Sequence, residues 1–186
     1  MSRKPRPAAP GIPAASKAEL DSMIRVDHAG EYGAIRIYEG QLAVLRGRPG
    51  ARKSVAAIER MAKQEEHHLK TFDAIVNARK VRPTALEPLW RVAGFALGAA
   101  TALMGEKTAM ACTAAVEAVI DDHYAGQIEK LGDEELKKTV AEFRADEAAH
   151  RHEALASGAE EAPGYRLLSE AIKAGCRLAI RLSERI

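Results

Sequence analysis

"MAKQEEHHLKTF" (residues 61–72) places acids and histidines inside a stretch whose apolar residues recur at helical spacing. Met61 and Phe72 lie three turns apart, which predicts an amphipathic helix with one apolar face. Glu65 and His68 fall on that same face. A helix that buries this face must bury two ionisable groups with it, so something in the fold has to compensate for their charge.

The same combination recurs near the end of the chain, where Glu147 and His150 lie on the apolar face of another predicted helix. Residues three apart lie on one side of a helix, so each Glu-x-x-His pair can reach one common object. Glu31 and Glu117 stand alone on the apolar faces of two further helices. The order is Glu, Glu-x-x-His, Glu, Glu-x-x-His with similar spacing, which predicts a duplicated helical hairpin.

Apolar periodicity predicts four core helices, each with a stripe of apolar residues that can face a common core. Ser16 and Glu19 have the spacing of a capping box at the start of the first helix. Breaks rich in Gly and Pro separate the segments, so successive helices are expected to run antiparallel. The four stripes run over residues 20–45, 55–76, 110–131 and 136–154.

Two further segments and a tail complete the predicted architecture. Residues 89–105 are largely apolar, and residues 165–186 form a helix with basic residues along it. Residues 1–16 contain four prolines and no acid, so we expect a disordered tail followed by one domain over 17–186. The predicted fold class is all-α: an antiparallel four-helix bundle with an additional apolar interfacial helix and a C-terminal amphipathic helix.

The composition agrees with this fold class and restricts the chemistry. Of 186 residues, 47% are apolar but only 4% aromatic, which favours helices over a β-sheet. The net charge is +2 with both signs interspersed, so nucleic acid is not expected as a partner. Cys112 and Cys176 are isolated from each other in the sequence, which offers neither a disulfide framework nor a thiolate metal site.

Four carboxylates in an apolar bundle would each cost several kcal/mol without compensation, more than a domain stable by about 5–15 kcal/mol can absorb. Two divalent ions would balance the four negative charges, and neutral imidazoles would complete the coordination. Oxygen and imidazole ligands without thiolate favour iron or manganese over a structural zinc site. This pattern is typical of ferritin-like di-iron bundles. The predicted metal ligands are Glu31, Glu65, His68, Glu117, Glu147 and His150.

Neighbouring polar residues receive a different interpretation. Glu66, His67, Arg151 and His152 lie off the apolar stripes and are expected in solvent. His123 and Tyr124 follow Glu117 by about two turns; by default they are a hydrogen-bonded histidine and a core tyrosine, and the alternative is that they orient a ligand or relay protons or electrons. His28, one turn before Glu31, is a weaker candidate for the same supporting role.

Beyond spacing, the sequence resembles the demethoxyubiquinone monooxygenase family, the di-iron hydroxylases of ubiquinone biosynthesis. The resemblance extends over nearly everything after residue 22. It is carried by "RVDHAGEYGAIRIYEGQLAVL" (25–45), "QEEHHLKTF" (64–72), "VRPTALEPLWRVAGFALGAATALMG" (81–105), "AMACTAAVEAVIDDHYAGQI" (109–128), "EFRADEAAH" (142–150) and "AGCRLAIRLSERI" (174–186).

The resemblance implies that the family's six iron ligands fall on the same six residues that helical phase selects. It further implies two iron ions per chain, NADH as reductant, O₂ as cosubstrate, and hydroxylation of the open ring carbon of a polyprenyl benzoquinone that lacks one methoxy group. In some relatives a lipid-binding protein of the ubiquinone pathway delivers the quinone, so such a partner is also an expectation here.

A polyprenyl substrate would require contact with a bilayer. The apolar segment 89–105 is shorter than the roughly 20 residues of a membrane span, so we expect it to lie in the interface with Trp90 at headgroup level. The alternative is an ordinary buried helix. Basic residues of the last helix would attract anionic lipid. The expected location is the cytoplasmic face of a bacterial inner membrane or the matrix side of a mitochondrial inner membrane.

Three other functions use similar residues. A ferritin-like hydroxylase acting on a tRNA base is disfavoured by the near-neutral charge and by the apolar segment. A ferroxidase or iron-storage subunit would share the ligands but would assemble into a shell. A metal-free scaffold for other quinone-pathway proteins is the third alternative, and metal analysis of the purified chain would decide it.

Overall fold

Six α-helices and one short 3₁₀ segment make up residues 15–186, the part of the chain that the computed structural model describes, and no strand occurs in that range. The all-α fold class is therefore confirmed. The elements are α1 (Lys17–Leu45), α2 (Arg52–Arg79), α3 (Glu87–Leu103), α4 (Glu106–Ile128), α5 (Glu134–Ala156), η1 (Ala159–Glu161) and α6 (Tyr165–Ser183).

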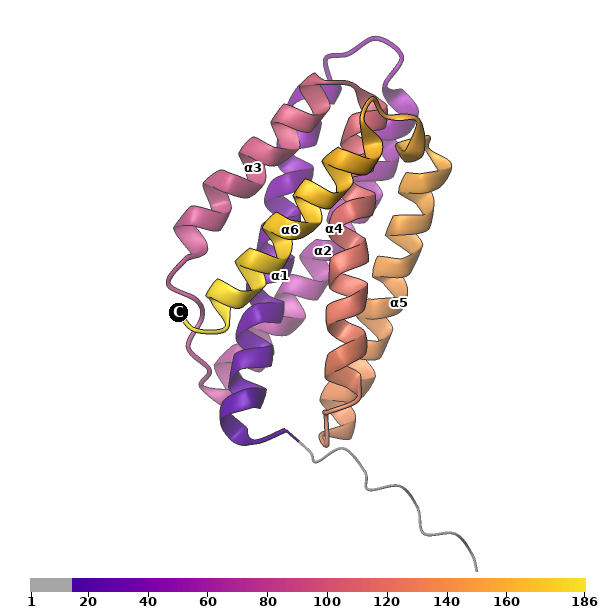
Figure 1. The fold of residues 1–186 in the computed structure, drawn as a ribbon. Helices are drawn as coiled ribbons and strands as arrows, with labels where there is room; N and C mark the ends of the chain where they lie inside the picture. Colours follow the sequence, from indigo (N-terminus) through magenta and orange to yellow (C-terminus); the bar gives the residue numbers. More distant parts are fainter. Residues whose placement is uncertain (1–14) are drawn as a thin grey trace, which may run out of the picture.

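The four long helices α1, α2, α4 and α5 form the bundle, with α1 antiparallel to α2 and α4 antiparallel to α5 (Figure 1). Helix α3 packs chiefly against α1, and α6 packs chiefly against α4. Each half of the chain is thus a hairpin followed by a third helix that covers the outside of that hairpin's first helix. The duplication predicted for the hairpins extends to this third helix.

Caps define where the helices begin. Ser16 and Glu19 form the predicted capping box at the start of α1, and the Asp133 side chain accepts a hydrogen bond from the Leu136 amide at the start of α5. The predicted tail lies outside the described residues except for Ala15 and Ser16. The Ala15 amide donates to the Lys130 carbonyl at 2.9 Å, and the predicted boundary at Lys17 stays a prediction.

Two of the three apolar core clusters lie at opposite ends of the four-helix bundle. One cluster includes Leu42, Met61 and Ala154, and the other includes Ile24, Phe72 and Phe143. On each core helix the residues of these two clusters flank the predicted ligands in sequence. The polar cluster therefore lies at mid-height of the bundle, enclosed by apolar packing at both ends.

Glycines allow α3 to pack closely on α1. A Cβ atom at Gly98 would lie 2.0 Å from the Ile37 carbonyl oxygen, and one at Gly40 would lie 2.1 Å from the Phe95 carbonyl oxygen. Such distances are far inside van der Waals contact, so only hydrogen fits at these positions. This contact anchors the apolar segment along the bundle.

The outer side of α3 remains exposed, so this segment is not an ordinary buried helix. Leu89, Val92, Phe95 and Leu103 are each more than two fifths exposed. Trp90 is half-buried, and its indole Nε1 donates to the Ser183 hydroxyl at 3.0 Å. Among residues 15–186, no helix combines the length and apolar character needed to cross a membrane.

Candidate metal centre

The structure brings the six predicted ligands together from four helices. Helix α1 contributes Glu31, α2 contributes Glu65 and His68, α4 contributes Glu117, and α5 contributes the last two. Each of the six residues is at most 2% exposed. In contrast, Glu66, His67, Arg151 and His152 are all exposed, as their helical phase predicts.

The six side chains divide into two overlapping groups whose ligand atoms lie within 4.8 Å of one another. Glu65 and Glu147 belong to both groups. Each group also has one carboxylate and one histidine of its own, so each group would be able to hold one cation, with Glu65 and Glu147 within reach of both. The first group adds Glu31 and His68, and the second adds Glu117 and His150.

Both imidazoles direct Nδ1 into the cluster. Nδ1 of His68 lies 3.4 Å from Glu31 Oε2 and 3.3 Å from Glu147 Oε1. Nδ1 of His150 lies 3.0 Å from Glu65 Oε1. The two Nδ1 nitrogens and the carboxylate oxygens thus converge on the same small volume.

Unsatisfied polar atoms concentrate at this cluster and test whether metal fits it. Eight buried nitrogen and oxygen atoms of the six residues have no hydrogen-bond partner. Buried polar atoms are almost always paired, and an unmet ligand requirement is one of the few explanations for an exception. The orphaned atoms are Glu31 Oε2, both carboxylate oxygens of Glu65 and of Glu147, Glu117 Oε2, and Nδ1 of His68 and His150.

Confining four carboxylates in the metal-free cluster shifts the pKa values of its residues. Burial raises the pKa of Glu31 and of Glu117 well above the usual range, and neighbouring carboxylates raise it further. Burial also disfavours the charged forms of Glu65 and His150, but the close contacts between imidazole nitrogens and carboxylate oxygens in the cluster outweigh it. The pKa of Glu65 falls to about 2 and that of His150 rises to about 9. Protons thus supply positive charge that divalent ions would otherwise provide.

Two tyrosines link the halves of the bundle through the unshared carboxylates. The Tyr38 hydroxyl on α1 donates to Glu117 Oε1 on α4 at 2.5 Å, and the Tyr124 hydroxyl on α4 donates to Glu31 Oε1 on α1. Each tyrosine follows the single Glu of its own helix by seven residues and bonds to the single Glu of the other. Tyr124 therefore makes the contact with a predicted ligand that a supporting role would require, and that role stays a prediction.

Sequence reasoning missed Tyr38 as a site residue, although the signal was present. The spacing Glu-x₆-Tyr occurs in both halves of the chain, at 31 and 38 and again at 117 and 124. Both tyrosines fall on the apolar stripes of their helices, so the sequence alone favours a core position for each.

The outer nitrogens of the two histidines also have partners that sequence reasoning missed. His68 Nε2 lies 3.1 Å from Asp146 Oδ2, and His150 Nε2 lies 3.0 Å from Gln64 Oε1. Asp146 and Gln64 each directly precede the Glu of the opposite helix's Glu-x-x-His motif. Such partners fix the ring orientation and decide which nitrogen carries the hydrogen.

The remaining histidine candidates are bonded elsewhere. His28 Nε2 lies 2.9 Å from Asp73 Oδ1 on α2. His123 Nε2 lies 2.8 Å from the Gln127 amide nitrogen, which also donates to the buried Asp27. Neither histidine is hydrogen-bonded to any of the six cluster residues, so both are satisfied histidines beside the centre.

The sequence is similar to a known protein family and to characterised members of it. A family model described as "Ubiquinone biosynthesis protein COQ7" matches residues 18–183. The chain is 56% identical over 179 residues to the 3-demethoxyubiquinol 3-hydroxylase of Rhodospirillum rubrum, covering 95% of this chain and 82% of that protein.

Similar relatives occur in eukaryotes. The human mitochondrial NADPH-dependent 3-demethoxyubiquinone 3-hydroxylase is 51% identical over 178 residues, covering 92% of this chain and 80% of its own length. The mitochondrial 5-demethoxyubiquinone hydroxylase of Saccharomyces cerevisiae is 42% identical over 189 residues, with the same coverage of 92% and 80%.

Proposed function

The chain belongs to the family of the ubiquinone biosynthesis protein COQ7, and we propose that it is a di-iron monooxygenase that hydroxylates the ring of a demethoxyubiquinone or its quinol. The observation that carries this proposal is the buried cluster in which eight orphaned polar atoms converge from four helices. The names of the relatives supply the reaction class and the substrate.

The proposed ligands of two iron ions are Glu31, Glu65, His68, Glu117, Glu147 and His150. Bound there, iron would supply the electrons and the coordination positions that reaction with O₂ requires. The protein's own contribution is geometric. Glu65 and Glu147 hold the two positions together, while Tyr38 and Tyr124 each bind one oxygen of an unshared carboxylate and so fix its rotamer. The apolar clusters on either side exclude water.

The reductant is proposed as a reduced nicotinamide nucleotide. The sequence resemblance implies NADH, whereas the names of the mammalian relatives state NADPH. O₂ is the proposed cosubstrate. Measuring the rate of hydroxylation with NADH and with NADPH in the same assay decides between the two reductants.

We extend the proposal to a peripheral position on a membrane. The apolar surface carried by α3 and α6, here called the α3/α6 face, includes Leu89, Val92, Phe95 and Leu103 on α3 and Leu167 and Leu178 on α6. Both helices lie on the same side of the bundle (Figure 1), and Leu97 of α3 packs against the buried cluster that includes Ile172 of α6. An exposed apolar surface of this kind suits the interface of a bilayer, where a polyprenyl quinone resides.

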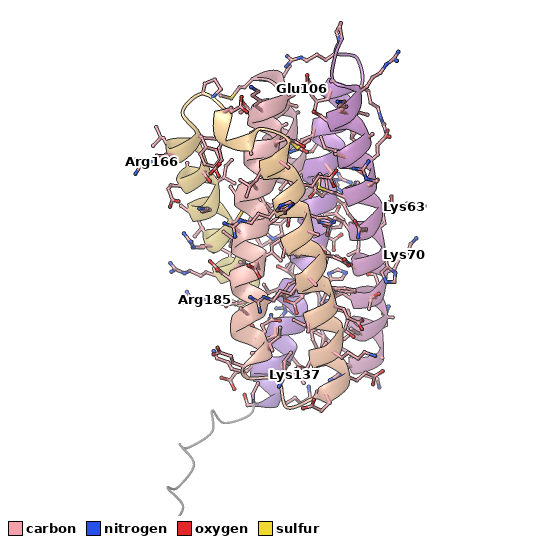
Figure 2. The ribbon with its side chains drawn as sticks, turned by 90° about the vertical axis from the view of Figure 1, so that its right-hand side faces the viewer. Lys63, Lys70, Glu106, Lys137, Arg166 and Arg185 are labelled. Atoms are coloured by element: carbon pink, nitrogen blue, oxygen red, sulfur yellow. The ribbon has the colours of Figure 1, made fainter. Side chains whose placement is uncertain are left out.

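Basic residues lie beside this apolar surface. Arg166 and Arg185 project from the two ends of the α6 segment, whereas Lys63 and Lys70 project from α2 on another side (Figure 2). Arg177 and Arg181 on α6 are also exposed. Their charge would add attraction to anionic lipid.

The α3/α6 face is also the surface proposed for a lipid-binding partner protein. The proposed location is the cytoplasmic face of a bacterial inner membrane, with the matrix side of a mitochondrial inner membrane as the alternative.

An assay on iron-loaded protein tests the proposed function. The purified chain, reconstituted with two equivalents of Fe²⁺, is given a short-chain demethoxyubiquinol with NADH or NADPH under ¹⁸O₂. We expect one ¹⁸O atom in the hydroxylated ring. Oxidation of Fe²⁺ without any hydroxylated product, in a protein that retains both ions, would contradict the proposal and favour a ferroxidase.

A further inference from the structure

The two metal positions are related by the duplication of the chain, but the groups that support their histidines are chemically different. His68 Nε2 faces the carboxylate of Asp146, whereas His150 Nε2 faces the amide oxygen of Gln64. The two distances, 3.1 and 3.0 Å, are nearly equal. The main difference between these two contacts is therefore charge.

That charge acts directly on the ligand nitrogen. A histidine that binds metal through Nδ1 must leave Nδ1 unprotonated, so Nε2 carries the hydrogen and donates it outward. Donation to a carboxylate is charge-assisted and increases the electron density on the imidazole, whereas donation to a neutral amide does so less. His68 should therefore be the stronger donor to a cation.

The surroundings of the two rings strengthen the difference. The Phe143 ring stacks on His68 with centroids 3.9 Å apart and planes 24° from parallel, which restricts rotation of that imidazole. Within residues 15–186, no aromatic ring is found against His150. The Gln64 amide nitrogen also lies 3.4 Å from Asp146 Oδ1, which helps to hold the carboxylate in place. His68 is thus the more rigidly held ligand as well as the more basic one.

We propose that the two positions are inequivalent and that the position formed by Glu31, Glu65, His68 and Glu147 binds a divalent ion first and more tightly. Asp146 is the positioning residue responsible, because it acts through His68 without touching the metal. This inference rests on the proposed metal centre and adds an order of filling to it. Neutral Gln64 leaves the second position weaker and more readily emptied.

Titration of the metal-free chain with Co²⁺, followed by visible absorption, tests the proposal without any turnover. We expect two binding steps whose dissociation constants differ by about tenfold or more, since outer hydrogen-bond partners of ligands typically change metal affinity by 10- to 100-fold. Asp146→Asn should weaken the tight step by about that factor and leave the weak step nearly unchanged. Gln64→Glu should tighten the weak step.

Asp73→Asn is the matched control. It removes a carboxylate from a histidine Nε2 in the same way, but its partner His28 lies outside the cluster, so both steps should be unchanged. Asp146 and Asp73 are 41% and 54% exposed, so neither change should unfold the bundle, and circular dichroism checks this.

Two results would overturn the inference. Two equal steps in the unmodified chain, unaffected by Asp146→Asn, would remove the inequivalence while leaving the metal centre intact. Failure to bind any Co²⁺ would remove the metal centre and the inference together.

Discussion

At the scale of single residues, the four buried carboxylates have opposite effects on two properties of the chain. They lower the stability of the metal-free chain and raise its affinity for metal. Glu117 illustrates the conflict, because burial and the Glu147 charge raise its pKa well above that of an exposed glutamate. Without metal, folding must either protonate this group or bury its charge. With metal, the same charge becomes an attractive interaction.

Glu117→Gln should therefore have opposite effects with and without metal. In the metal-free chain at pH 7, the neutral side chain removes the cost of burying an acid and should raise the free energy of unfolding by about 1–3 kcal/mol, while its oxygen can still accept from Tyr38. Bound Fe²⁺ should fall from two per chain to one or fewer. Denaturant unfolding and iron analysis measure the two effects. A variant that is less stable without metal and still binds two ions would contradict this view.

The pH dependence of stability should also change sign with metal. In the metal-free chain, burial disfavours the charged imidazole of His150, but close contacts with the carboxylates of Glu147 and Glu65 overcome burial and raise its pKa to about 9. A raised pKa in the folded state means that the folded chain binds more protons, so its stability is highest below about pH 6.5 and falls as pH rises toward 9. The raised pKa values of Glu31 and Glu117 act in the same direction.

Metal-loaded protein should show the reverse trend over the same range, because protons compete with the cation for Glu and His ligands and stability is lost as pH falls. Melting temperatures between pH 6 and 9, recorded with Co²⁺ and with a chelator, compare the two. If the melting temperature depends on pH in the same way with Co²⁺ and with the chelator, the cluster does not bind Co²⁺.

At the scale of elements, the contact between α1 and α3 depends on the absence of side chains at two positions. Gly98→Ala would place a methyl carbon 2.0 Å from the Ile37 carbonyl oxygen, so the helices must separate. We expect a loss of about 1–3 kcal/mol in the free energy of unfolding, as for other overpacked contacts.

The matched control for this change is Gly126→Ala on α4, where a Cβ atom would meet nothing within 4 Å. Alanine has the higher helix propensity, so this variant should gain about 0.4–1 kcal/mol. Urea denaturation of both variants makes the comparison. Equal effects would show that the close approach of α1 and α3 does not limit stability.

The exposed side of α3 supports a separate prediction. Val92→Asp with Phe95→Asp places two charges on the α3/α6 face at residues outside the buried core, since Val92 is 63% and Phe95 is 43% exposed. Co-sedimentation with vesicles that contain anionic lipid should fall at least tenfold, because charged groups are costly in the apolar part of the interface.

Ala141→Asp, at an exposed position of α5, is the control and should sediment like the unmodified chain. Unchanged vesicle binding by the double variant would exclude the α3/α6 face as the membrane surface.

At the scale of the whole molecule, the duplicated sequence explains why so much of the site could be predicted. Helical phase alone decides which acid and which histidine of "EEHH" face inward, and Glu65 and His68 are buried while Glu66 and His67 are exposed. The same phase in both halves implies a common centre once four helices pack together. Periodicity therefore gave the fold class and the six residues that meet.

Phase does not specify which atoms meet across helices. The bond between Tyr38 and Glu117 joins residues 79 apart in sequence, and the contact between His68 and Asp146 joins residues 78 apart. Both depend on how the two hairpins are placed against each other, which periodicity along one helix cannot determine. The path of α3 along α1 likewise depends on glycine contacts between distant segments.

Anomalous diffraction tests the central claim most directly, because it locates iron without reference to activity. Crystals loaded with Fe²⁺ under anaerobic conditions, with data collected on both sides of the iron absorption edge, should show two peaks between Glu65 and Glu147. One peak should lie within bonding distance of His68 Nδ1 and the other of His150 Nδ1. Peaks only at the protein surface, or none at all, would contradict the account.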